Sequence, residues 1–126
     1  MYQLWYTLVM NSNIILQVVF YRTNTGSEPV REWLKGLDKE ERKIIGEDIK
    51  TVQLGWPLGM PLVRKVDKGL WEVRIQLDRK IARVLFTAYE GMMVLLHGFV
   101  KKSQKTPAND LKLAKQRMAT LGGRNG

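Results

Sequence analysis

The chain has 126 residues, a formal net charge of +9, no cysteine and one histidine. This length suits one domain with a real hydrophobic core. The absence of cysteine excludes disulfides and thiolate metal sites, and one histidine argues against a histidine metal centre, so we expect no metal and no cofactor. Residues 101–126 hold seven basic residues against one acidic residue. Charge of this sign favours nucleic acid, a membrane surface or an acidic protein as partner.

Targeting signals are not evident. Residues 1–13 are apolar but lack the cationic start of a secretory signal, and no stretch reaches the roughly 20 apolar residues of a membrane-spanning helix. We therefore expect a cytoplasmic protein with no membrane partner. Residues 1–13 form a leader of unknown role, residues 14–121 a single domain, and residues 122–126 a flexible tail.

The first half of the domain predicts a strand followed by two helices. Residues 14–21 are rich in β-branched and aromatic residues, which favours a strand. Ser27 can cap a helix whose apolar positions, Trp33 among them, recur at helical spacing. Asp38 can cap a second helix that ends at Gly55, so the two helices form an αα-hairpin.

The second half predicts an antiparallel meander and a last helix. Three strands, at 70–77, 80–89 and 92–102, are joined by the two-residue turns Asp78-Arg79 and Glu90-Gly91. A breaker-rich loop, 55–61, precedes them. The last helix spans 106–121, with Thr106 as N-cap, Pro107 at its first position and Gly122-Gly123 as its stop. The fold class is α+β.

Two-residue turns fix the register of the strands. Arg74 then faces Arg83 in the first hairpin, and Arg83 faces Gly98 in the second. One face of the sheet is apolar, includes His97 as a satisfied core histidine, and packs on the helices. The opposite face carries Glu72, Arg74, Gln76, Arg83, Gly98 and Lys102.

This polar face is a candidate anion site. Two arginines directly across a ladder repel each other, and an anion above them would relieve that cost. Gly98 beside Arg83 would leave a depression in which a base or sugar can approach. The alternative is that Glu72 neutralises one arginine on a solvated face, and the pattern leaves both interpretations open.

A second cationic feature lies where the last strand meets the last helix. Lys101, Lys102 and Lys105 precede a helix start at Thr106. The free N–H groups of a first helical turn and the lysines favour the same sign of ligand charge. The alternative is that these lysines only solvate a loop.

Two segments, GLWEVRI at 69–75 and LLHGFVKKSQKTP at 95–107, resemble the RelE/ParE superfamily of bacterial toxins, in particular the HigB-type branch known as phage-derived Gp49-like proteins. The resemblance covers about residues 14–121 and implies a RelE-like fold. It further implies a toxin of a toxin–antitoxin pair, an endoribonuclease that cuts translated mRNA in the ribosomal A site. The implied partner is a HigA-like helix-turn-helix antitoxin, through which alone the toxin reaches operator DNA.

The resemblance also implies site residues. The basic cleft of the family matches Arg74, Arg83 and Lys101 or Lys102. Related toxins often have a lysine near Arg74, and an arginine does not readily lose its proton, so proton abstraction would pass to Lys101, Lys102 or Glu72. The expected catalytic residues are Arg74, Arg83, Lys102, Lys101 and Glu72, and the expected RNA-binding residues are Arg64, Lys65, Arg79, Gly98 and Lys105.

The implied chemistry is metal-independent transesterification. A ribose 2′-hydroxyl attacks the adjacent phosphate and expels the 5′ oxygen, which leaves a cyclic phosphate. Arginines would stabilise the charge that builds on the phosphoryl oxygens. Two other classes remain open: a ParE-like gyrase inhibitor, and a non-catalytic module that grips nucleic acid through its phosphates.

Overall fold

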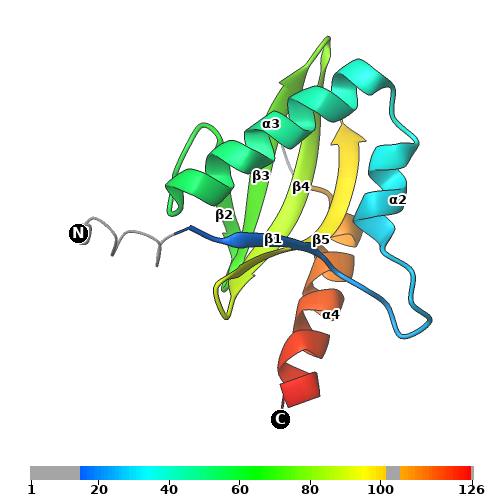
Figure 1. Cartoon of the computed structure of the whole chain (residues 1–126), viewed down its shortest axis with the longest axis vertical. Helices are drawn as coiled ribbons and strands as arrows, with labels where there is room; N and C mark the ends of the chain where they lie inside the picture. The colour runs from blue at the N-terminus through cyan, green and yellow to red at the C-terminus, as the bar shows by residue number, and fades with distance from the viewer. Residues whose placement is uncertain (1–14, 102–105, 126) are drawn as a thin grey trace, which may run out of the picture.

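The computed structural model describes residues 15–101 and 106–125 and shows one mixed sheet with helices on both of its faces (Figure 1). In chain order the elements are β1 (Gln17–Phe20), α2 (Pro29–Lys35), α3 (Lys39–Gly55), β2 (Val63–Asp67), β3 (Leu70–Leu77), β4 (Lys80–Tyr89), β5 (Met92–Lys101) and α4 (Ala108–Asn125). The strand order is β1-β5-β4-β3-β2; β1 runs parallel to β5 and the other pairs are antiparallel. This α+β architecture is consistent with the predicted RelE-like fold. Among the described helices, none is long and apolar enough to cross a membrane.

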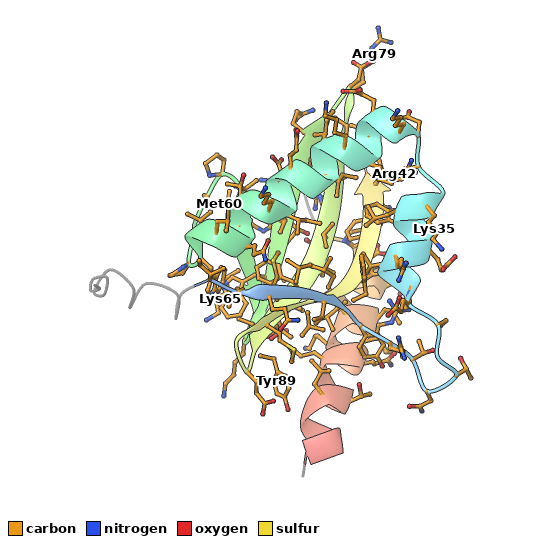
Figure 2. All side chains as sticks on the ribbon, in the orientation of Figure 1. Lys35, Arg42, Met60, Lys65, Arg79 and Tyr89 are labelled. Atoms are coloured by element: carbon orange, nitrogen blue, oxygen red, sulfur yellow. The ribbon has the colours of Figure 1, made fainter. Side chains whose placement is uncertain are left out.

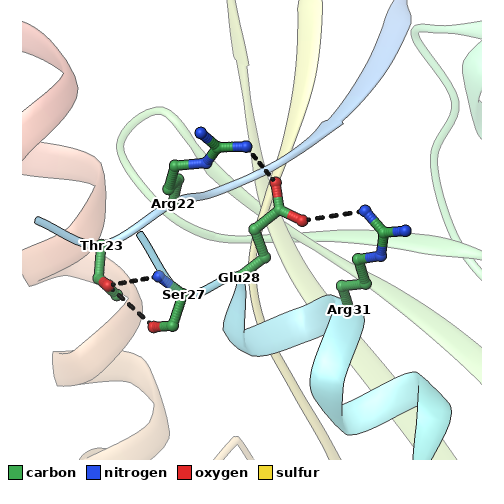
Figure 3. Close-up of polar contacts among 5 residues, drawn as sticks. All are labelled: Arg22, Thr23, Ser27, Glu28 and Arg31. Atoms are coloured by element: carbon green, nitrogen blue, oxygen red, sulfur yellow. Dashed lines mark hydrogen bonds and ion pairs between the residues drawn. The ribbon is translucent and has the colours of Figure 1, made fainter. Parts of the chain in front are cut away.

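Side-chain hydrogen bonds and ion pairs stabilise the link from β1 to α2 (Figure 3). The hydroxyls of Thr23 and Ser27 lie 2.8 Å apart, and Glu28 pairs with Arg22 at 3.4 Å and with Arg31 at 3.2 Å. The predicted cap at Ser27 is wrong, because α2 begins one residue after Glu28 and has no side-chain cap.

The start of α3 follows the prediction. The Asp38 side chain accepts a hydrogen bond of 2.8 Å from the backbone N–H of Glu41 and satisfies a free donor of the first turn. Ile45, Ile49 and Val52 are buried along one side of the helix. α2 and α3 thus cover the first face of the sheet, as Figure 1 shows.

The core beneath these helices is apolar and aromatic. Trp56, from the loop after α3, meets Trp71 and Phe86 edge-to-face, with ring centroids 4.9 and 5.4 Å apart. The sheet residues buried on this face include Val73, Ile75, Ala82, Val84, Met93 and Leu95. The predicted apolar face of the sheet is confirmed over β3 and β4.

One strand was missed by the sequence analysis. β2 pairs antiparallel with β3, so that Arg64 lies opposite Glu72, and the register shifts between Lys65 and Asp67. Three of its five residues are charged, which hides the apolar alternation of a strand. Pairing of β2 with β3 therefore places a third arginine, Arg64, beside the predicted site.

The first hairpin has the predicted register. Arg74 lies opposite Arg83. In the turn between β3 and β4, Arg79 has φ +63°, and in the next turn Glu90 and Gly91 have φ +50° and +77°. Left-handed residues are typical of two-residue hairpin turns, because their twist matches that of the strands.

The second hairpin departs from the prediction after four pairs, counted from its turn. Phe86 lies opposite Leu95 as predicted, but a register shift follows, and Leu85 then lies opposite His97 and Arg83 opposite Phe99. This irregularity adds one residue to β5, which moves every later side chain to the other face. The predicted faces of His97 and Gly98 are therefore wrong.

α4 packs on the second face of the sheet, chiefly against β5 and β4. Leu85, Leu96 and Ala114 are buried in the cluster between them. The prediction of Thr106 as N-cap is wrong, because the helix begins at Ala108. The backbone N–H of Leu111 donates a hydrogen bond of 3.1 Å to the carbonyl of Pro107, the residue just before the helix. The predicted stop at Gly122-Gly123 is also wrong, because the helix continues to Asn125.

Candidate functional site

The polar residues on the α4 side of the sheet lie in two rows of side chains that run across the strands and also contain two apolar residues. The first row consists of Arg64, Glu72, Leu85 and His97, and the second of Arg74, Arg83 and Phe99. Neighbouring strands are about 4.8 Å apart, so side chains in one row are direct neighbours. The start of α4 lies over the first row, because Thr106 contacts Glu72 and Asp110 contacts His97.

Glu72 is fully buried and is surrounded by three guanidinium groups. Its Oε1 lies 4.0 Å from Arg64 Nε and 3.9 Å from Arg74 Nε, and its Oε2 lies 3.7 Å from Arg83 Nη1. Thr106 donates a hydrogen bond of 2.6 Å to Oε2 and accepts one of 3.2 Å from Arg64. We call Arg64, Glu72, Arg74 and Arg83 the arginine cluster.

The arginine cluster holds more positive than negative charge. Three guanidiniums against one carboxylate give the four side chains a net charge of +2. Residues 1–14 and 102–105, which lie outside the described part, contain no Asp or Glu in the sequence. A group of side chains with more positive than negative charge favours an anionic ligand, and guanidinium groups form strong hydrogen bonds to one.

The three arginines differ in their access to solvent. The side chains of Arg64 and Arg74 are 35% and 14% exposed, whereas Arg83 is fully buried. Burial lowers the pKa of Arg83, the negative charge of Glu72 opposes this shift, and the positive charges of Arg74 and Arg64 add to it. A ligand arriving from solvent meets Arg64 and Arg74 first, while Arg83 acts from beneath.

His97 forms a close pair with Asp110, which the sequence analysis did not find. His97 Nε2 lies 2.6 Å from Asp110 Oδ1, and the two side chains are 17% and 22% exposed. The imidazole stacks on Phe99 with ring centroids 5.4 Å apart. A carboxylate that orients an imidazole is the arrangement of a general base. The sequence signal was only the single histidine and the single acidic residue after position 101.

Three predicted RNA-binding residues lie apart from the arginine cluster. Gly98 is on the opposite face, where a Cβ would overlap the ring of Trp33, so it forms no depression beside Arg83. Lys65 lies opposite Trp71, which belongs to the core beneath α2 and α3. Figure 2 shows Arg79 at the far tip of the β3–β4 hairpin.

The predicted lysine corner is only partly described. Lys101 is the exposed last residue of β5 and lies opposite Ile81, one row beyond Arg83. Lys102 and Lys105 lie outside the described residues. The structure therefore brings together Arg64, Glu72, Arg74 and Arg83 and leaves Lys101 at the margin of the same face.

The fold and the arginine cluster define a class: small basic α+β proteins with a five-stranded mixed sheet and a cationic site on one face. A family model described as "Phage derived protein Gp49-like" matches residues 32–119. This is more than half of the chain, so the chain belongs to the Gp49-like family, a family of RelE/HigB-type toxins. The resemblance seen in the sequence is thereby confirmed. A search among curated proteins found no match to the chain. The family is associated with RNase toxins and with antitoxin partners.

Proposed function

We propose that this protein is the toxin of a type II toxin–antitoxin system and acts as a ribosome-dependent endoribonuclease that cuts mRNA and so inhibits translation. The observation that carries the proposal is the arginine cluster, with its net charge of +2 beside the His97–Asp110 pair. Membership of the Gp49-like family supports it. The partner we propose is a HigA-like antitoxin, which would also make the only link to operator DNA.

In this proposal the arginines bind and stabilise the phosphate that is cut. Arg64 and Arg74 are exposed enough to donate to its oxygens, and the planar guanidinium suits that geometry. Arg83 adds positive charge from beneath, where water is excluded and an electrostatic interaction is strengthened. The cluster therefore stabilises the extra negative charge of the pentavalent transition state.

We assign proton abstraction to His97 rather than to the lysines or Glu72. Glu72 already accepts a hydrogen bond from Thr106 and is fully buried. His97 and Arg83 lie on adjacent strands two residues apart in register, which separates their Cα atoms by about 8 Å. A nucleotide can bridge that distance between two long side chains. Imidazole is also the side chain that exchanges its proton most readily near neutral pH.

The reaction then proceeds in one displacement. His97 takes the proton of the ribose 2′-hydroxyl while the 2′ oxygen forms a bond to phosphorus. The bond from phosphorus to the 5′ oxygen breaks, and water supplies the proton that this oxygen takes up. The products are a 2′,3′-cyclic phosphate and a 5′-hydroxyl end. Asp110 holds the imidazole and stabilises its charged form.

The ribosome would supply the orientation of the mRNA. Holding the attacking and leaving oxygens in line with phosphorus contributes several kcal/mol to a reaction of this kind. The arginine cluster is well suited to hold one phosphate, and an A site that presents a fixed codon would place that phosphate over it. Lys101, exposed at the end of β5, is available for a neighbouring phosphate.

The test is primer extension on mRNA after the protein is induced. The native chain is expected to produce discrete breaks, and Arg74→Gln to reduce them by about 100-fold, as the loss of one transition-state donor does. Lys65→Gln is the matched control, because Lys65 is a nearby cation on the opposite face, and it should cut like the native chain. Undiminished cutting by Arg74→Gln would overturn the site. Growth arrest without breaks would favour a gyrase inhibitor or a non-catalytic binding module.

A further inference from the structure

A cavity opens at the edge of the sheet beside the arginine cluster. Its volume is about 390 Å³, and the described residues that line it are Asp48, Pro61, Leu62, Arg74, Gln76 and Ile81. β2 begins at Val63 opposite Val73, so Arg74 and Gln76 belong to the part of β3 that extends past β2. Asp48 comes from α3, which crosses β3 in Figure 1. The size lies within the roughly 300–1,000 Å³ of small-molecule sites.

Apart from Arg74, the polar side chains of this cavity offer hydrogen-bond acceptors. The carboxylate of Asp48 is half-buried and accepts only, when it is ionised. Gln76 Nε2 already donates to the Leu77 carbonyl at 2.8 Å and to the Lys80 carbonyl at 3.2 Å, which leaves its oxygen as an acceptor. Burial raises the pKa of Asp48, and the neighbouring charge of Glu47 adds to the rise. The half-buried carboxylate gains from a hydrogen-bond donor.

The remaining walls suit a flat ring. Pro61, Leu62 and Ile81 are apolar and can pack on the faces of a nucleobase. Arg74 lines the same cavity and belongs to the arginine cluster, so a base held here would be joined to a phosphate bound there. The cavity and the cluster can therefore hold two parts of one nucleotide.

The arrangement of acceptors selects among the four bases. Guanine presents two neighbouring donors, N1–H and the N2 amino group, which one carboxylate can accept together. Uracil presents a single N–H, and adenine and cytosine each present one amino group beside an acceptor nitrogen. Opposed acceptors repel, and a buried group left without its partner costs free energy.

We propose that this cavity binds a guanine of the RNA strand next to the phosphate held by Arg74, and that Asp48 determines the specificity. The inference rests on the proposed function in taking an RNA strand as the ligand. It goes further in assigning a base preference to residues outside the arginine cluster.

Binding of mononucleotides tests the inference without any cleavage. Nuclear magnetic resonance titration of the full chain with guanosine 3′-monophosphate and uridine 3′-monophosphate compares two bases with the same phosphate. The guanine nucleotide should bind about tenfold more tightly, the discrimination that a good bidentate contact provides. Asp48→Asn replaces one acceptor with a donor and should remove the difference. Glu47→Gln, an exposed change one residue away, should keep it.

The results separate the inference from the proposed function. Equal binding of the two nucleotides by the native chain would overturn the guanine site, even if mRNA is cut. Selective binding of guanosine 3′-monophosphate by a chain that cuts no mRNA would contradict the proposed nuclease activity and support the guanine site. Where cutting occurs, the breaks made by the native chain should cluster beside guanine, and those of Asp48→Asn should spread over all four bases.

Discussion

Replacement of Glu72 by glutamine tests the arginine cluster in depth. The carboxylate lies within 4.0 Å of three guanidiniums and is fully buried, while glutamine keeps the shape and an oxygen that can accept from Thr106. Breaking a buried ion pair costs roughly 3–5 kcal/mol. Arg64 is 35% exposed, so solvent screens its interaction with Glu72. We therefore expect the free energy of unfolding to fall by the lower end of this range, about 3 kcal/mol. The melting temperature should fall by about 10 °C.

Urea unfolding monitored by circular dichroism measures this loss. Glu32→Gln is the control, because Glu32 pairs with Lys35 at 3.7 Å on the surface and its loss should cost less than about 1 kcal/mol. Inorganic phosphate, at ten times the Kd of the phosphate, should raise the free energy of unfolding of Glu72→Gln by roughly 1.4 kcal/mol, because the bound anion replaces the missing negative charge. If Glu72→Gln is as stable as the native chain, or responds to phosphate no more than Glu32→Gln, the reasoning about the cluster is refuted.

Three further predictions concern packing, acid stability and the general base. Gly98→Ala forces the new methyl group against the Trp33 ring and should destabilise the fold by about 1–3 kcal/mol, measured by the urea midpoint; an unchanged midpoint would contradict the close packing. The hydrogen bond from Lys115 lowers the pKa of Asp67. The stability that this bond gives the fold is therefore present above the ordinary carboxyl pKa of 3.8 and is lost as the pH falls below that value. Asp67→Asn should therefore melt below the native chain near neutral pH and match it in acid; a gap that persists in acid would refute this. His97→Asn should slow mRNA cutting in a translation extract about 100-fold at an unchanged melting temperature, whereas the loss of a purely structural histidine would lower the melting temperature and leave cutting by the folded protein in place.

Much of the fold follows from local patterns in the sequence. The apolar spacing of the two N-terminal helices and the cap at Asp38 predict α3 well, because caps and periodicity are short-range signals. The two-residue turns likewise fix the pairing of Arg74 with Arg83. Periodicity, the Asp38 cap and the first hairpin were therefore predictable, whereas the local signals at Ser27, Thr106 and Gly122-Gly123 were not followed.

The missed features depend on long-range packing. The register shift beside Leu85 has no mark in the sequence, yet it reverses the faces of His97 and Gly98. β2 is short and charged, and its strand conformation depends on pairing with β3. Thr106 looks like a helix cap, but its hydroxyl is drawn to the buried Glu72 instead.

The candidate site was predictable to the same extent. Arg74, Arg83 and Glu72 were found because their strands have a regular register. The place of Arg64 required β2, and the His97–Asp110 pair required both the register shift and the docking of α4. The cavity that contains Asp48 joins a helix to the edge of a strand, and no spacing in the sequence connects the two.

The proposed function requires the arginine cluster to bind a phosphate of RNA. The most direct measurement is the guanidinium spectrum of the ¹⁵N-labelled full chain, titrated with a short RNA whose 2′-O-methyl groups prevent cutting. The Nε–H signals of Arg64 and Arg74 should shift with RNA, while those of Arg22 and Arg31, which pair with Glu28 on the surface, should stay in place. Signals of Arg64 and Arg74 that do not move at saturating RNA would contradict the proposed function.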